Sequence, residues 1–156
     1  MKSIHSLIAA LTFAALAKTS DAQSPATGAT VINSNKVAAA FAKGMPLFET
    51  SEYKIHASRR DAPGVAEIHT RDTDIIHVLE GSATFVTSGT VVEPKTIAAD
   101  EICGKEIKGG ESRRISKGDV IVVPNGVPHW FKQVDGPLLY YVVKVTSVGG
   151  VSTDKR

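Results

Sequence analysis

The sequence contains a single cysteine, Cys103, among its 156 residues. An intrachain disulfide is therefore excluded, and the stability of the fold must come from packing. Cys103 could be a reactive thiol, a cross-link between two chains or a partly buried loop residue. The partly buried loop residue is the favoured interpretation.

The sequence also lacks a concentration of positive charge. Lys and Arg outnumber Asp and Glu by only 18 to 16, and the short basic runs are limited to residues 59–60 and 113–114. Nucleic-acid binding would require basic residues clustered on one face or arm, so no nucleic-acid partner is expected. With 42% hydrophobic and 22% charged residues, the chain has the composition and length of one globular domain.

An apolar run near the start, residues 7–17, is too short to cross a bilayer. Lys2 precedes this run, and the small-x-small pattern Ser20-Asp21-Ala22 follows it. These are the three parts of a secretory signal peptide, predicted here over residues 1–22. The alternative of a buried helix leaves the charge and the cleavage pattern unexplained. We expect a secreted or periplasmic protein with no membrane partner after cleavage.

The remaining chain divides into three predicted parts. Residues 23–50 form a lead-in and one short helix, in which the polar cap at 33–35 precedes an alanine-rich body at 36–43. Residues 51–148 form a β-barrel, and residues 149–156 form a C-terminal tail.

The barrel region consists of short β-type segments separated by turn residues, a pattern typical of an all-β sandwich or closed barrel. The predicted strands cover residues 53–58, 65–71, 75–79, 83–87, 113–115, 120–123, 130–133 and 138–145. The polar stretch 90–111 is predicted to be a long loop between two halves of the barrel.

Two segments contain the residue types that carry chemistry. In the first, alternation places Glu67, His69 and Arg71 on one face of a strand, and Asp74 opens the next strand. In the second, an apolar strand ends at a Pro-Asn-Gly turn, after which His129 begins a new strand.

These segments resemble the two motifs of the cupin superfamily. The first motif has a glycine, a His-x-His pair, a downstream Glu and a second glycine; the matching residues here are Gly64, His69, Asp74 and Gly81. The second is Gly-x5-Pro-x-Gly-x2-His-x3-Asn, matched by Gly118, Pro124, Gly126 and His129, with Gln133 in place of Asn. The resemblance implies an all-β fold with a single cupin-type antiparallel jelly-roll barrel and one short N-terminal helix.

The resemblance also implies a divalent metal ion inside the barrel, with His69, Asp74 and His129 as ligands. Arg71 stands at the second His position, and a guanidinium offers no lone pair to a metal. Two imidazoles and a carboxylate remain a recognised ligand set for Fe(II), and Mn, Zn, Ni and Cu are equally compatible with these ligand types. Glu67 is a candidate fourth ligand or general base.

Arg71 has two interpretations: it docks an anionic substrate beside the metal, or it forms an ion pair with Asp74 or Glu67 that replaces the metal. The favoured function is a metal-dependent oxygenase, isomerase or decarboxylase acting on a small anionic or oxygen-rich substrate. The alternatives are a non-catalytic cupin that binds a metal or small ligand, and a structural module. A homodimer is expected from the family alone.

Overall fold

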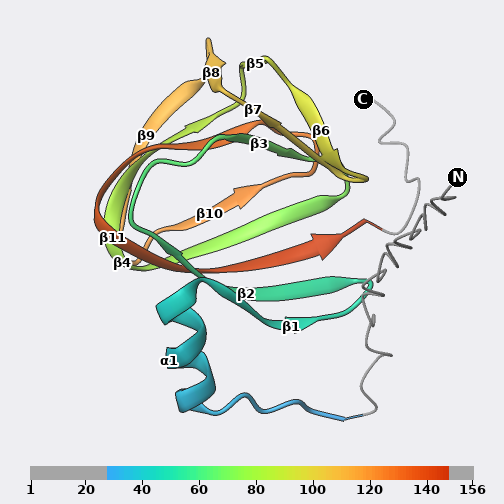
Figure 1. The fold of residues 1–156 in the computed structure, drawn as a ribbon, viewed down its shortest axis with the longest axis vertical. Helices are drawn as coiled ribbons and strands as arrows, with labels where there is room; N and C mark the ends of the chain where they lie inside the picture. Colours follow the sequence, from blue (N-terminus) through green and yellow to red (C-terminus); the bar gives the residue numbers. More distant parts are fainter. Residues whose placement is uncertain (1–27, 148–156) are drawn as a thin grey trace, which may run out of the picture.

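A computed structural model describes residues 28–147. This part of the chain forms one helix and a curled antiparallel β-structure that closes around an interior (Figure 1). In chain order the elements are α1 (Ser34–Lys43), β1 (Met45–Glu49), β2 (Tyr53–Arg60), β3 (Ala66–His69), β4 (Asp72–Thr87), β5 (Thr90–Val92), β6 (Lys95–Ala98), β7 (Glu101–Gly104), β8 (Glu106–Lys108), β9 (Glu111–Ser116), β10 (Val120–Val123) and β11 (His129–Thr146). The predicted all-β jelly-roll class with one short N-terminal helix is confirmed.

Two long strands, β4 and β11, form the frame of the barrel. They pair antiparallel along almost their whole length, and β11 also pairs with β2 on its other side. β9 pairs antiparallel with the C-terminal half of β4, and β10 pairs antiparallel with its N-terminal half. Each long strand joins two segments that the sequence predicted as separate strands. Both strands bend, but they remain paired with each other on either side of the bend.

The bends in the long strands have a local cause at Gly81 on β4. Its φ is +79°, and a Cβ atom there would collide with the carbonyl oxygen of Pro137 on the facing strand. Only glycine tolerates both this backbone conformation and this close approach. The register between β4 and β11 shifts opposite this point, between Asp135 and Tyr140.

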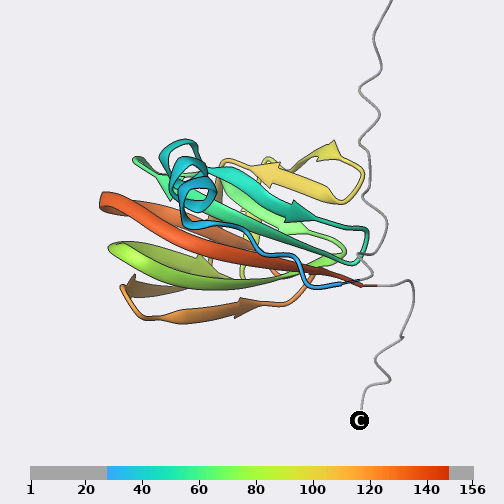
Figure 2. The ribbon, with the colours of Figure 1, turned by 90° about the horizontal axis from the view of Figure 1, so that it is seen from below.

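The helix covers the outer face of the barrel beside β1 and β2 (Figures 1 and 2). The side chain of Asn33 accepts a hydrogen bond from the backbone N–H of Lys36, and Gly44 ends the helix in the left-handed conformation. Ala40 packs with Leu47 and Ala57 in a small cluster beneath it. β1 lies within the predicted lead-in segment, where no strand was expected.

The stretch 90–111 is not the long loop that the sequence predicted. It contains two short hairpin-like pairings, β5 with β8 and β6 with β7, and β7 also pairs with β3. Val91 and Ile107 are buried against Ala66 and Val86, so two apolar side chains anchor this polar segment to the barrel. Isolated apolar residues in a three-residue strand give no detectable period, which explains the wrong prediction.

The main core fills the barrel between β4, β9, β10 and β11. Its buried members are Ile76, Val78, Ala83, Phe85, Ile115, Val123, Phe131, Leu138, Tyr140 and Val142. Within residues 28–147 there is no helix of the length and hydropathy needed to span a membrane. The predicted signal peptide, residues 1–22, and the predicted tail, residues 149–156, lie outside the described residues.

Candidate metal centre

A cavity of about 550 Å³ opens into the barrel next to the main core. Side chains from β2, β3, β4 and β11 form its walls, and residues 98–101 lie at one side. Its lining is unusually polar for a barrel interior, with three cationic and several acidic side chains. Such a cavity, lined by convergent polar groups, is the default location for ligand binding.

Glu67, His69 and His129 meet at one end of this cavity. One ligand atom from each lies within 4.8 Å of the other two. Glu67 Oε2 is 3.8 Å from His69 Nε2 and 3.7 Å from His129 Nε2, and the two imidazole centroids are 5.1 Å apart. Alternation along β3 places Glu67 and His69 on the same face, while His129 is the antiparallel partner of Glu67 across the β3–β11 ladder.

His129 is held as a neutral imidazole with one nitrogen aimed at the cluster. The residue is 3% exposed, and Nδ1 lies 3.4 Å from the carbonyl oxygen of Val127, which leaves Nε2 facing Glu67 and Asp74. Burial lowers the pKa of His129 below its ordinary value and outweighs the opposing effect of the nearby carboxylates. A neutral imidazole has the lone pair that a metal ion requires.

Asp74 also lies beside the imidazoles, but its carboxylate is already engaged. Its Oδ2 is 3.5 Å from His69 Nε2 and 3.9 Å from His129 Nε2. Both of its oxygens accept hydrogen bonds of 2.9 Å from Lys144 Nζ, the residue directly opposite on β11. Asp74 therefore supplies negative charge next to the cluster, and its predicted role as a ligand remains a prediction.

Arg71 does not share the face of Glu67 and His69, contrary to the expectation from alternation. β3 ends at His69, and Thr70 turns the chain away by bonding to the backbone and side chain of Asp100. The Arg71 side chain is about half exposed, donates to the carbonyl oxygen of Ser147 and is not among the cavity-lining residues. The residues of β3 that face the cavity are thus Glu67 and His69. The ion pair predicted between Arg71 and Asp74 or Glu67 is absent among the described residues.

Several cavity residues were missed from the sequence. The four polar side chains that β2 turns inward are Lys54, His56, Ser58 and Arg60. Their strict period of two was a readable signal, because alternating polar residues opposite an apolar face also describe a strand that lines a polar interior. Lys144 gave no such signal, because the residues that precede it in this part of β11 are apolar or aromatic.

Two further candidates have ordinary roles. His77 is exposed on the outer face of β4. Cys103 lies half-buried opposite Glu67 on β7, and burial, together with the charges of Glu67 and Glu101, raises the pKa of its thiol. The thiol therefore stays protonated near neutral pH and is a poor nucleophile.

Comparison with known proteins defines first the fold and then the family. The structure resembles that of BH2720 from Bacillus halodurans, with a TM-score of 0.54 and 14% identity over 81% of this chain and 88% of the other. The cupin family model matches residues 21–154. The chain therefore belongs to the cupin family.

Two further structural matches have TM-scores below 0.5. The cupin domain of Schizosaccharomyces pombe Cnp3 matches with a TM-score of 0.49 and 14% identity, covering 67% of this chain and 60% of that one. The DMSP lyase DddQ from Ruegeria pomeroyi DSS-3 matches with a TM-score of 0.44 and 18% identity, covering 65% and 42%. This chain thus spans less than two thirds of either protein. No curated protein matches the sequence.

Proposed function

We propose that the protein is a metal-dependent enzyme acting on a small anionic or oxygen-rich molecule, with Glu67, His69 and His129 as the metal ligands. The observation that carries this proposal is the convergence of two imidazoles and one carboxylate from β3 and β11 at the end of a polar cavity. The two histidines are 60 residues apart in the sequence, and the barrel brings their rings to 5.1 Å.

The donor set suits a divalent cation. Two neutral imidazole nitrogens and a carboxylate oxygen are the ligands of many Fe, Mn, Zn and Ni sites, and three protein ligands leave open positions for substrate. A metal bound here would act as a Lewis acid toward a substrate oxygen. His129 is oriented by its contact with Val127, as outer partners commonly orient ligating imidazoles.

The surrounding residues define what else the cavity can do. Lys54 and Lys144 are paired with Asp72 and Asp74, so Arg60 is the cation of the cavity lining with hydrogen-bonding capacity left for an anionic substrate. Phe131 and Ile76 form an apolar wall that limits the access of water to the cluster. Glu67 accepts from Arg60 through Oε1 and faces the imidazoles through Oε2, so it is the carboxylate placed to contribute an oxygen to a metal ion held by the imidazoles.

A non-catalytic binding protein is the second candidate, and one observation favours it. Lys144 holds both oxygens of Asp74 at 2.9 Å, so one of the two carboxylates beside the imidazoles is neutralised by the protein itself. A cupin that binds an organic ligand without catalysis has no need of a second free carboxylate beside the imidazoles to hold a metal ion.

The metal proposal is tested by elemental analysis of protein purified without chelator. We expect about one equivalent of transition metal in the wild type and less than a tenth of that in His69→Ala, His129→Ala and Glu67→Gln. His77→Ala is the matched control, because it removes an exposed imidazole from the outer face and should retain the metal. A metal-free wild type, or full metal content in His129→Ala, contradicts the proposal.

Removal of the metal should also lower stability. A ligand present at a hundredfold excess over its Kd stabilises the folded state by about 2.7 kcal/mol. EDTA should therefore lower the Tm of the wild type and leave the Tm of His129→Ala unchanged in the same scan. Equal shifts in the two proteins would place the bound metal elsewhere.

Export remains a proposal supported by the composition of residues 1–22. N-terminal sequencing of the protein recovered from culture fluid or periplasm should begin at Gln23.

A further inference from the structure

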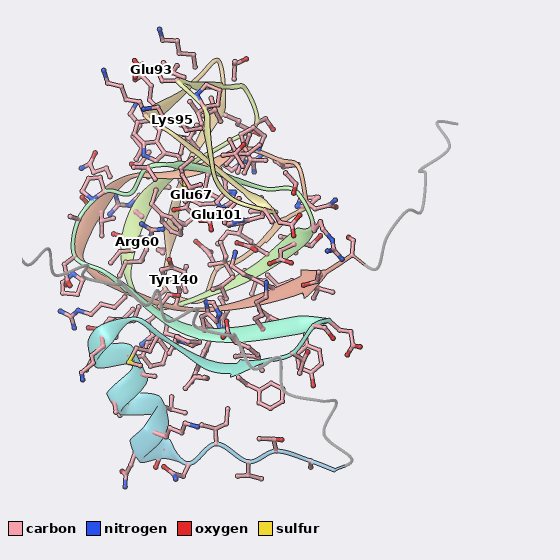
Figure 3. The ribbon with its side chains drawn as sticks, turned by 45° about the vertical axis from the view of Figure 1, so that its right-hand side comes forward. Arg60, Glu67, Glu93, Lys95, Glu101 and Tyr140 are labelled. Carbon is pink, nitrogen blue, oxygen red and sulfur yellow. The ribbon has the colours of Figure 1, made fainter. Side chains whose placement is uncertain are left out.

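Arg60 is a partly buried cation at the inner end of the cavity, held from several sides. Its Nε donates to the hydroxyl oxygen of Tyr140 at 3.0 Å, and its Nη2 donates to Glu67 Oε1 at 3.3 Å. The guanidinium carbon lies 4.5 Å from the centroid of the Phe131 ring. Figure 3 shows Arg60 between Glu67 and Tyr140 inside the barrel.

Arg60 packs against the backbone of Gly64 on one side of the cavity. Its Nη1 lies so close to Gly64 that a Cβ atom there would displace the guanidinium. The backbone of Gly64 is held in place, because its N–H donates to the carbonyl oxygen of Phe131 and its carbonyl oxygen accepts from Trp130 Nε1. The contacts with Tyr140, Glu67 and Phe131 orient the guanidinium from its other sides.

Most of the hydrogen-bonding capacity of this guanidinium is unused. Of its five N–H groups, the structure of residues 28–147 engages two, one to Tyr140 and one to Glu67. Arg60 is one of the residues that line the cavity, and because no fully enclosed side-chain nitrogen in these residues lacks a partner, its unpartnered Nη1 retains some solvent access. The other two cavity cations, Lys54 and Lys144, each pair with a carboxylate at 2.9 Å or less.

Tyr140 adds a second donor to the same place. Its hydroxyl oxygen accepts from Arg60, and its own O–H can donate either to a ligand or to Ser58, which lies directly opposite on β2. Burial raises the pKa of Tyr140 despite the opposing charge of Arg60, and the phenol therefore keeps its proton at neutral pH. Its ring is fixed by stacking on Phe131, with centroids 5.2 Å apart.

We infer that Arg60 and Tyr140 form a carboxylate-binding subsite, and that the substrate is a short carboxylic acid with a second oxygen one or two carbons from its carboxylate. A guanidinium fork binds a carboxylate through two parallel hydrogen bonds. Glu67 contacts Arg60 through one oxygen and the two imidazoles through the other, so an anion on Arg60 lies next to the proposed metal position. The second oxygen of such an acid would reach that position, and in this respect the inference rests on the proposed function.

The test uses glycolate as the acid with a second oxygen, acetate as the plain carboxylate and 1,2-ethanediol as the neutral analogue. Binding to the full mature protein is measured by calorimetry and by the fluorescence of Trp130, the single tryptophan, whose indole contacts Gly64. Measurements are made as purified and after dialysis against EDTA. We expect saturable binding of both carboxylates, glycolate more tightly when metal is present, and binding of the neutral diol at least about tenfold weaker.

Arg60→Gln should weaken glycolate and acetate binding roughly ten- to hundredfold, as expected for loss of a charged bidentate contact. Arg60→Lys should recover part of this loss, and Tyr140→Phe should lose several-fold while keeping the ring stack. Arg59→Gln is the matched control, because Arg59 points outward and pairs with the exposed Asp61. Its glycolate Kd should remain within about twofold of the wild type.

The inference is overturned if neither carboxylate binds the wild type, or if Arg60→Gln binds glycolate as tightly as Arg59→Gln does. Should Arg60→Gln fail to fold by circular dichroism, unchanged glycolate binding in both Arg60→Lys and Tyr140→Phe overturns it. The metal content of each variant is measured in parallel. Loss of carboxylate binding with full metal content supports the subsite, whereas a metal-free wild type that still binds acetate through Arg60 contradicts the proposed enzyme and leaves the subsite intact.

Discussion

The two ends of the cavity contain similar residue types but differ in how completely their charges are paired. At what we call the lysine end, Lys54 bonds to Asp72 at 2.8 Å and Lys144 bonds to Asp74 at 2.9 Å. At the imidazole end, formed by Glu67, His69, His129 and Arg60, the carboxylate lies 3.7–3.8 Å from both imidazole nitrogens and 3.3 Å from Arg60.

This difference separates a structural network from a binding site. Charged groups at hydrogen-bonding distance satisfy each other and hold strands together. At the imidazole end, Glu67 Oε1 is bonded to Arg60, but Glu67 Oε2 and the two imidazole nitrogens converge without reaching that distance and can bind an ion between them. The lysine end connects β2, β4 and β11 and adjoins the imidazole end at Asp74, which lies 3.5 Å from His69 Nε2.

The largest expected effect comes from breaking the lysine end. Lys144→Met leaves Asp74, whose side chain is 5% exposed, without its ammonium partner. Breaking a buried ion pair typically costs about 3–5 kcal/mol, so we expect a loss of that size in the free energy of unfolding by urea titration. Arg113→Met, which breaks an exposed pair with Glu111, should cost less than about 1 kcal/mol. Equal losses in the two variants would contradict the assignment of the Lys144–Asp74 pair as a stabilising contact of the barrel.

A smaller effect, dependent on pH, is expected at Asp72. Burial alone would raise the pKa of this carboxyl, but hydrogen bonds from Lys54 and Thr146, with the charges of Lys54 and Lys144, lower it overall. A carboxyl with a lowered pKa in the folded state stabilises the protein above its ordinary value of 3.8, and this contribution disappears as the pH falls through the lowered value.

Asp72→Asn should therefore cost about 1 kcal/mol at pH 7, and the gap to the wild type should narrow below about pH 4. Urea titrations at several pH values measure both quantities. A gap that widens on acidification would mean that the carboxyl is destabilised in the folded state. Asp135→Asn serves as the comparison at an exposed carboxyl: hydrogen bonds from Arg114 and Gln133 lower the pKa of Asp135 too, so its gap to the wild type should narrow in the same direction and be smaller.

The smallest effect is expected at Arg71. Because its side chain is exposed and bonds to the carbonyl oxygen of Ser147, Arg71→Gln should change the unfolding free energy by less than about 0.5 kcal/mol. Its metal content and glycolate affinity should match the wild type. A tenfold loss of glycolate binding in this variant would restore Arg71 as the docking residue and remove that role from Arg60.

The sequence was sufficient for the parts of the site that depend on local rules. Strand alternation placed Glu67 and His69 on one face, and the second motif located His129. Arg71 was misplaced because the strand stops where Thr70 bonds to Asp100, a partner 30 residues away. A turn that depends on a distant partner leaves no mark in the local pattern.

The residues that surround the cluster were harder to predict for a different reason. Arg60 is recognisable as polar and inward-facing on β2, but its contact with Tyr140 joins residues 80 apart. Lys144 is inward-facing only because β11 changes its phase between Phe131 and Leu138. The fold class follows from the spacing of the predicted strands. The contacts of Arg60 and Lys144 follow from the register in which β11 pairs with β2 and β4.

Because the inward-facing positions of β11 change from odd to even numbers along the strand, the number of residues between its two ends affects which side chains reach the site. His129 and Lys144 both face the cavity although an odd number of positions separates them, which an unbroken strand would not allow. The irregular pairing between Phe131 and Tyr140 absorbs the difference. If the irregular pairing is kept, a single-residue deletion in that stretch turns either the imidazole or the ammonium outward, while removal of two residues preserves both orientations. The number of residues between the two ends of β11 is thus one determinant of which side chains face the cavity.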